Sequence, residues 1–241
     1  MPKPIKYRIR VKSRKIQLVL DKVLLLRLMR RLEGRFWGIF GLLLLNAALA
    51  VCFLLRPDLQ SFSTAFSDFG TDIQTAPFFI TGVFGAAYGL WRWRNYVSKS
   101  FKNPGIITLL LTLIIIGLYL VVFMPVGLTD TIDRLHYFGF AVAGVAMALT
   151  VVADLLLRRT RRSKKFRQWR AIRVLSLVMI ILGFTITLLS ADRFNYDLDI
   201  SLVGEALLLW GFGLWVIVKT YQGEGTRSGI SKLLNKVLIV Q

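Results

Sequence analysis

The sequence predicts an all-α integral membrane protein, a six-transmembrane-helix bundle with both termini in the cytoplasm. Three observations predict this fold. Of the 241 residues, 55% are apolar, and the mean hydropathy is +0.60. The apolar residues gather into six long stretches, and the basic residues gather in alternate connecting segments. A soluble domain could not keep so much apolar surface away from water.

The six apolar stretches each have about the length that a membrane-spanning helix needs. A hydrocarbon core of about 30 Å requires roughly 20 helical residues. Five stretches contain no Asp, Glu, Lys or Arg, and the sixth contains only Glu205, near one end. The expected spans are residues 36–55, 73–91, 103–129, 135–153, 174–191 and 200–218.

The orientation follows from the charges of the connecting segments. Residues 1–35, 92–105, 158–173 and 219–241 hold 12, 4, 9 and 4 Lys or Arg, which is 29 of the 32 in the chain. The other three segments hold one Arg each and eight Asp together. Because basic residues concentrate in cytoplasmic loops, both termini are expected on the cytoplasmic side of the cell membrane. An even number of spans also places both termini on the same side of the membrane, which agrees with the basic charge of both terminal segments.

Two flanking segments complete the predicted organisation. Residues 1–35 form a basic cytoplasmic segment in which 16–32 are expected to be an amphipathic helix on the membrane surface. The transmembrane domain covers 36–220, and 221–241 form a cytoplasmic tail. With one Cys and one His, the chain has no disulfide framework, zinc cage or bis-histidine haem site, so we expect no cofactor and no tight metal site.

The densest basic run lies between the fourth and fifth predicted spans. Interleaved with Phe166 and Trp169, it has the charge and stacking groups of an RNA-binding segment. Its position in a short cytoplasmic loop favours a different interpretation, in which it sets the topology and contacts anionic headgroups. We therefore expect lipid partners and no nucleic acid. The residues are Arg158, Arg159, Arg161, Arg162, Lys164 and Lys165.

The outer face carries the candidate functional site. Asp133 and His136 are three residues apart at the start of the fourth span, where they would share one helix face and form an acid/base pair. In the structural alternative, an Asp caps that helix and His136 lies at the headgroup level. Glu205 is a carboxylate within a span and is a functional candidate for that reason, whereas Asp154 is expected to pair with Arg158.

Three rim segments together resemble the domain of unknown function 998 family of prokaryotic multi-pass membrane proteins, which is similar in layout to the DRAM and suppressor-of-four-kinase proteins. The segments are residues 67–71 (SDFGT), 124–127 (MPVG) and 135–139 (LHYFG), and the resemblance covers about residues 36–220. Met124 stands where the family has Phe, and the acid that often follows the proline is displaced to Asp130. The resemblance implies a lipid-related role and the rim positions Ser67, Asp68, Gly70, Pro125, His136 and Tyr137.

These observations leave three functions open. In the first, a polar pocket of Asp68, Asp133, His136, Arg193 and Glu205 contacts lipid headgroups, with Ser67 and Tyr137 beside it. In the second, the protein is an enzyme acting on an outer-leaflet lipid, with His136 as the base, Asp133 orienting it, Arg193 holding a phosphate, and Ser67 or a water as nucleophile. The third, ranked last, is a small transporter working as a dimer, for which Glu205 is the only support. The pattern is compatible with a homo-oligomer and with a cytoplasmic protein partner.

Overall fold

The computed structural model describes residues 34–59, 65–100, 104–125, 127, 129–157, 164–190 and 200–222. These residues form long helices joined by short turns. The long helices are the first helix, Gly34–Leu55, followed by α2 (Ala76–Ser100), α3 (Gly105–Phe123), α4 (Asp130–Leu157), α5 (Lys164–Leu189) and α6 (Ser201–Gln222). Two short 3-10 helices, η1 (Pro57–Leu59) and η2 (Phe66–Gly70), lie between the first helix and α2.

Each of the six predicted stretches coincides with one long helix, and the ends of the helices differ from the predicted ones. The second helix begins at Ala76 rather than at residue 73, because residues 71–75 form turns, and it continues to Ser100. Helix α3 ends at Phe123, two residues before Pro125, because proline disfavours a helical residue directly before it. Helices α4 and α5 extend into the charged segments that flank their apolar stretches. The predicted helix over 16–32 and the tail 221–241, except its first two residues, lie outside the described residues.

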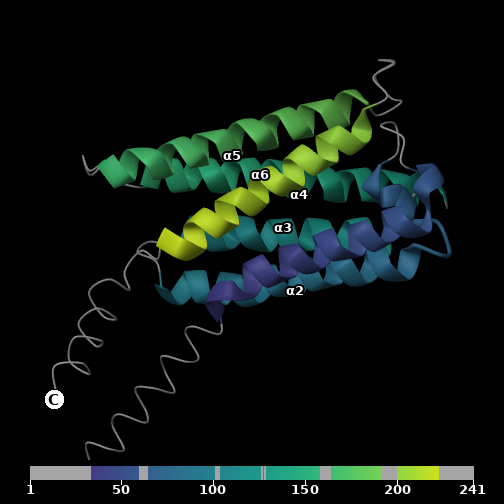
Figure 1. Ribbon diagram of the computed structural model, residues 1–241, viewed down its shortest axis with the longest axis horizontal. Coiled ribbons are helices and arrows are strands. Elements are labelled where there is room, and N and C mark those ends of the chain that lie inside the picture. The colour runs from purple at the N-terminus through teal and green to yellow at the C-terminus, as the bar shows by residue number, and fades with distance from the viewer. Residues whose placement is uncertain are drawn as a thin grey trace, which may run out of the picture.

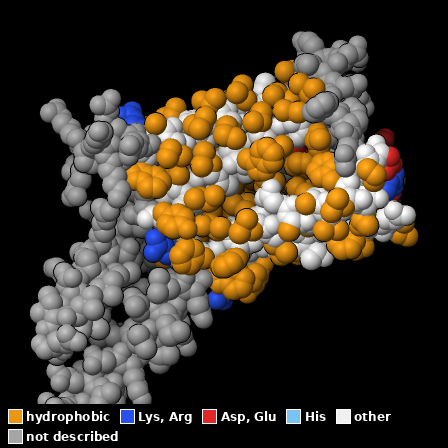
Figure 2. All heavy atoms as spheres, in the orientation of Figure 1, with side chains coloured by type: hydrophobic (Ala, Val, Ile, Leu, Met, Phe, Trp, Pro, Cys, Tyr) orange, Lys and Arg blue, Asp and Glu red, His pale blue; other side chains and the backbone are white. Residues whose placement is uncertain are grey.

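Five of the described helices are long and apolar enough to cross a membrane, namely the first helix, α3, α4, α5 and α6. Many of their large apolar side chains are exposed, among them Leu54 at 80% and Leu109 at 61% of the full side-chain surface. On the face that Figure 2 shows, apolar side chains cover most of the surface between the two ends of the bundle, and we call this surface the apolar belt. A soluble monomer does not expose a patch of this size, so the chain is a membrane protein.

Each long helix packs against the next one along the chain, so that the contacts form a ring; Figure 1 shows the bundle from the side. Helix α2 packs on α3, α3 on α4, α4 on α5 and α5 on α6. The ring closes where α6 meets the first helix, because the Trp210 indole donates to Asn46 Oδ1 at 3.0 Å and Val216 packs against Gly38. Trp93, Trp215 and Phe212 fill the centre, and none of the three is exposed.

Glycines set the closest approaches in this ring. A Cβ on Gly41 of the first helix would lie 2.9 Å from the carbonyl oxygen of Gly85 in α2. A Cβ on Gly183 of α5 would lie 2.5 Å from the carbonyl oxygen of Gly204 in α6. Both contacts are with backbone and leave no room for a side chain. The helix pairs therefore pack through small residues, as is common where helices associate in a membrane.

The two ends of the bundle differ in charge. At one end, which we call the acidic end, lie η1, η2 and the turn between α3 and α4, with Asp58, Asp68, Asp72, Asp130 and Asp133. At the other, the basic end, the first helix begins and α6 ends, since Arg35 Nε donates to the Thr220 carbonyl at 2.9 Å. Exposed Lys99 and Arg170 also lie there. On the face that Figure 2 shows, acidic side chains gather at the acidic end, beside a basic one.

Candidate functional site at the acidic end

The loop before α2 is anchored by a buried aromatic side chain. Phe69 of η2 is fully buried, with its ring centroid 4.9 Å from that of Phe53 in the first helix. The hydroxyl of Thr75, also fully buried, donates to the Phe69 carbonyl at 2.7 Å. Cys52 is a buried free thiol, as expected, and its Sγ lies 3.6 Å from the Thr75 carbonyl. This packing fixes η2 and with it the adjacent Asp68.

Asp68 and Glu205 accept hydrogen bonds from two consecutive backbone N–H groups. The N–H of Ala65 donates to Asp68 Oδ2 at 2.8 Å. The N–H of Phe66 donates to Glu205 Oε2 at 2.5 Å, across 139 residues of sequence. Glu205 is in the second turn of α6, so this contact ties α6 to η2. The intramembrane acid that the sequence singled out therefore has a structural partner in the loop that carries Asp68.

His136 is held by the carboxyl end of α3. Its side chain is 4% exposed, and Nδ1 lies 2.8 Å from the Met124 carbonyl and 3.1 Å from the Val121 carbonyl. Because both partners are acceptors, Nδ1 must carry the proton, and Nε2 is the nitrogen left for other chemistry. The last carbonyls of a helix have no partner within the helix, and His136 supplies a donor to them.

Asp133 is on the same helix and supports the same turn. Its Oδ1 accepts from the Gly127 N–H at 2.8 Å, and Gly127 has φ +90°, in the left-handed region. Thr129 caps α4, with its hydroxyl oxygen 3.3 Å from the Ile132 N–H. Helix α4 includes Asp133, as the spacing argument requires. Within the described part of the chain, however, Asp133 and His136 are not hydrogen-bonded to each other; each holds the α3–α4 turn separately.

Four of the five residues predicted for the outer pocket nevertheless gather at the acidic end. The charges of Asp133 and Asp68 both act on His136, and the charge of Asp68 acts on Glu205. Asp68, Asp133 and Glu205 are each partly exposed. These side chains come from η2, α4 and α6, so the site is assembled by the fold. The fifth residue, Arg193, lies outside the described residues.

The two remaining rim residues lie beside this group, which we call the acidic-end cluster (Asp68, Asp133, His136 and Glu205). Ser67 is partly exposed in η2. Tyr137 is 44% exposed, with its ring centroid 5.8 Å from that of His136. Phe138, next along α4, is 59% exposed. Exposed aromatic side chains at a helix end are typical of the level of the lipid headgroups.

Sequence reasoning gave no role to Arg56, which organises the turn after the first helix. Its guanidinium pairs with Asp58, at 2.6 Å between Nη2 and Oδ2, and with Asp72. The hydrogen bond from Arg56 lowers the pKa of the Asp58 carboxyl. The spacing Arg56-Pro57-Asp58 was a local signal for the first pair, but nothing in the sequence indicated the second.

A second ionic cluster is buried near the basic end. Asp154 of α4 contacts Lys219 of α6 through Oδ1, and Arg173 of α5 at 3.1 Å through Oδ2. The Trp215 indole N–H donates to the same carboxylate at 3.1 Å. The three charged side chains are each about 1% exposed. Asp154 was expected to pair with Arg158, which lies outside the described residues; its observed partners come from two other helices.

The predicted cytoplasmic basic run is described only in small part. Arg158, Arg159, Arg161 and Arg162 lie outside the described residues, and Lys164 and Lys165 are placed only as the start of α5. Among the described residues, no three His, Cys, Asp or Glu side chains are grouped so as to hold a metal ion.

The comparisons with known proteins agree with this helical architecture at the level of a family. A family model described as "Protein of unknown function (DUF998)" matches residues 39–220, from the second turn of the first helix to near the end of α6. The comparisons with curated proteins and with solved structures found no match.

Proposed function

We propose that this chain, which belongs to the DUF998 family of proteins of unknown function, is a six-span protein of the cytoplasmic membrane that binds lipid headgroups through its acidic-end cluster. The observation that carries the proposal is the convergence of Asp68, Asp133, His136 and Glu205 from three segments, at one end of an apolar belt. Polar side chains at that level of a membrane protein meet headgroups rather than acyl chains.

Two features support six spans with both termini in the cytoplasm. Helix α2 has 25 residues, about 37 Å at 1.5 Å per residue, and it lies along the first helix through the Gly41 and Gly85 contact. Helix α2 is less apolar than the five helices above, because it contains Arg92, Arg94 and Lys99 near its carboxyl end in addition to Gly, Trp and Tyr; those three cations lie toward the basic end. Arg35, at the start of the first helix, contacts Thr220, at the end of α6, so both helix ends lie at the basic end of the bundle. An excess of basic residues at that end supports a cytoplasmic location for it.

Reporter fusions would test this topology. Alkaline phosphatase fused after Phe123, where α3 ends at the acidic end, is expected to be active, because the enzyme folds only outside the cytoplasm. The same reporter fused after Ser100 or after Gln241 is expected to be inactive, and green fluorescent protein at those two sites is expected to fluoresce. An active phosphatase after Ser100, together with an active one after Phe123, would contradict a crossing by α2 and α3 in this order, and activity after Gln241 would contradict a cytoplasmic carboxyl terminus.

The charge of the cluster indicates which headgroup it binds. Asp68, Asp133 and Glu205 are carboxylates, and exposed Asp130 lies one turn from Asp133. These groups repel a phosphate and attract an ammonium. Phosphatidylethanolamine presents a primary ammonium that can donate up to three hydrogen bonds to such carboxylates. We therefore assign the ligand class as a lipid with an amine headgroup in the outer leaflet.

Native mass spectrometry of the full-length protein, released from nanodiscs of phosphatidylcholine and phosphatidylethanolamine, would test this assignment. The double variant Asp68→Asn/Asp133→Asn removes two charges but keeps an acceptor oxygen for the Ala65 and Gly127 N–H groups. We expect its preference for phosphatidylethanolamine to fall about tenfold, because a hydrogen bond to a charged group is worth roughly 1.5 to 3 kcal/mol.

The control is Asp58→Asn, which removes an acidic charge from the same end of the bundle but outside the cluster. It is expected to retain phosphatidylethanolamine as the wild type does. An unchanged preference in the double variant, or an equal loss in Asp58→Asn, would overturn the proposal. A chemically altered lipid formed by the wild type alone would instead establish the enzyme alternative.

A further inference from the structure

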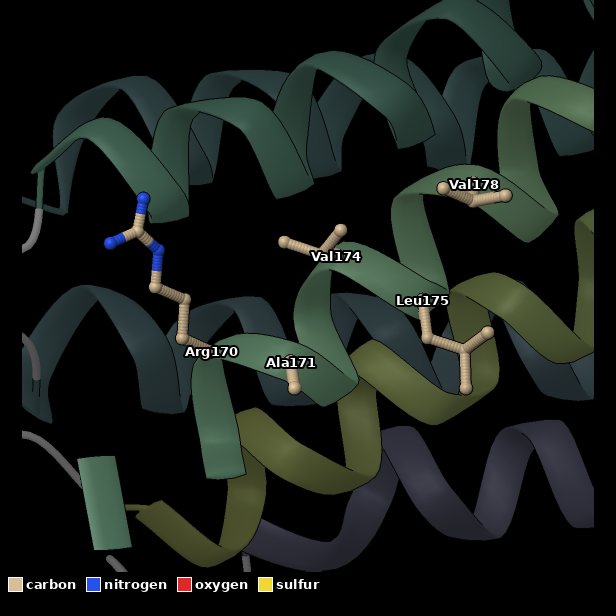
Figure 3. Close-up of a pocket in the computed structure, with 5 residues that line it drawn as sticks. All are labelled: Arg170, Ala171, Val174, Leu175 and Val178. Carbon is tan, nitrogen blue, oxygen red and sulfur yellow. The ribbon is translucent and has the colours of Figure 1, made fainter. Parts of the chain in front are cut away.

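One face of α5 forms the described wall of an open groove of about 600 Å³. Figure 3 shows the lining residues along α5, where they recur at intervals of about one helical turn and so share one side of the helix. Val174, Leu175 and Val178 are 45%, 53% and 45% exposed, and the first residue is a cation. The lining is Arg170, Ala171, Val174, Leu175 and Val178.

The opposite face of α5 makes the contacts that hold the bundle together. Arg173, Ser176 and Ile180 are buried there, and the Ser176 hydroxyl donates to the Gly211 carbonyl of α6 at 2.6 Å. The groove therefore lies outside the core, on the surface that the apolar belt presents to lipid. A lining of aliphatic side chains with one polar group at its end has the chemistry of an acyl chain with its headgroup.

The charge at the end of the groove selects the kind of headgroup. Arg170 is exposed, and residues 158–173 hold nine Lys or Arg and no Asp or Glu. A guanidinium binds phosphate through two parallel hydrogen bonds, and basic residues beside a membrane attract anionic lipids. From Arg170 to Val178 the helix rises about 12 Å, so a chain that starts at the guanidinium runs toward the middle of the bilayer.

We propose that this groove binds one acyl chain of an anionic phospholipid, whose phosphate contacts Arg170. The site lies at the basic end, so in the topology proposed above the lipid belongs to the cytoplasmic leaflet. It is distinct from the acidic-end cluster in position and in the charge of its ligand. The test of this contact does not depend on which way the protein is oriented in the membrane, because both leaflets of a nanodisc have the same lipid composition.

Native mass spectrometry of the full-length protein from nanodiscs of phosphatidylcholine and phosphatidylglycerol would test the groove. Arg170→Gln is expected to lower the preference for phosphatidylglycerol about fivefold, the equivalent of about 1 kcal/mol for one basic side chain at the surface. Leu175→Trp places a larger side chain in the groove and is expected to lower the number of retained lipids of either kind. Arg170 is exposed, so its replacement leaves the packing of the bundle unchanged.

Two matched variants control for general effects. Lys99→Gln removes an exposed cation from α2 at the same end, and Leu109→Trp enlarges a 61% exposed residue on α3. Both are expected to retain lipid as the wild type does. An equal loss of preference in Lys99→Gln would show that surface charge alone selects the lipid and would overturn the site. A protein dimer that Leu175→Trp dissociates, with lipid retention unchanged, would show that a second copy covers the groove.

Discussion

Replacing Asp154 by Asn is expected to destabilise the protein by about 3 kcal/mol or more. The carboxylate holds Lys219, Arg173 and the Trp215 indole, and the three charged side chains are almost fully buried. Removing one partner from a buried ionic group leaves the others in a low-dielectric site without their counter-charge, which typically costs about 3 to 5 kcal/mol. Thermal unfolding of the purified protein in detergent, followed by tryptophan fluorescence, measures the loss.

Asp130, an exposed acid on the same helix, provides the control that separates the effect of losing a buried charge from that of losing any acidic charge. Asp130 is exposed in the first turn of α4, so Asp130→Asn should cost only a few tenths of a kcal/mol up to about 1 kcal/mol, the range for a carboxylate at a helix N-terminus. Equal unfolding temperatures for Asp154→Asn and Asp130→Asn would contradict a structural role of the ionic cluster.

A triple variant tells whether the cluster does more than hold three helices together. Replacing Asp154 and Arg173 by Leu and Lys219 by Met removes all three charges, and apolar replacement of a complete buried ionic group is often neutral or stabilising. We expect the triple variant to recover most of the stability that Asp154→Asn loses. If stability returns and lipid retention is also unchanged, the cluster is structural. If stability returns while lipid retention is lost, the charges have a function besides packing.

The apolar helices could be predicted from the sequence, whereas the ionic partners of Asp154 could not. The spans were predictable because an unbroken run of about 20 apolar residues rarely forms anything but a membrane-spanning helix, and the resemblance to the DUF998 family was predictable from three rim motifs. The partners of Asp154 lie 19 and 65 residues away, on helices whose order around the ring the hydropathy does not encode. Spacing along one helix could suggest only Arg158.

The acidic-end cluster shows the same limit. Its membership was predictable, because polar residues gathered in the outer segments in greater number than membrane insertion requires. The individual contacts were not. Glu205 accepts from a backbone N–H 139 residues away, and His136 donates to carbonyls of the preceding helix. A residue pattern records donors and acceptors, but the backbone groups that meet them appear only when the chain is folded.

Replacing His136 is expected to have the second large effect on stability. Comparing two replacements shows which ring nitrogen, Nδ1 or Nε2, makes the stabilising hydrogen bond. His136→Ala is expected to destabilise the protein by about 1 to 3 kcal/mol, because the carbonyls of Val121 and Met124 lose a buried donor. Asn places an N–H close to the position of Nδ1, whereas Gln places one close to the position of Nε2. If His136 holds α3 through Nδ1, Asn should recover more of the unfolding temperature than Gln.

The same variants separate this structural role from the acid/base alternative. A general base at Nε2 would need the imidazole itself, so neither Asn nor Gln could replace it. Lipid mass spectrometry on native-lipid vesicles, incubated with the wild type and with His136→Asn, provides the second measurement. Recovery of stability with an unchanged lipid profile in both proteins means that His136 braces the end of α3 beneath the cluster. Recovery of stability with loss of a product that the wild type forms would mean that the buried ring does both, with Nδ1 holding α3 and Nε2 reacting with lipid.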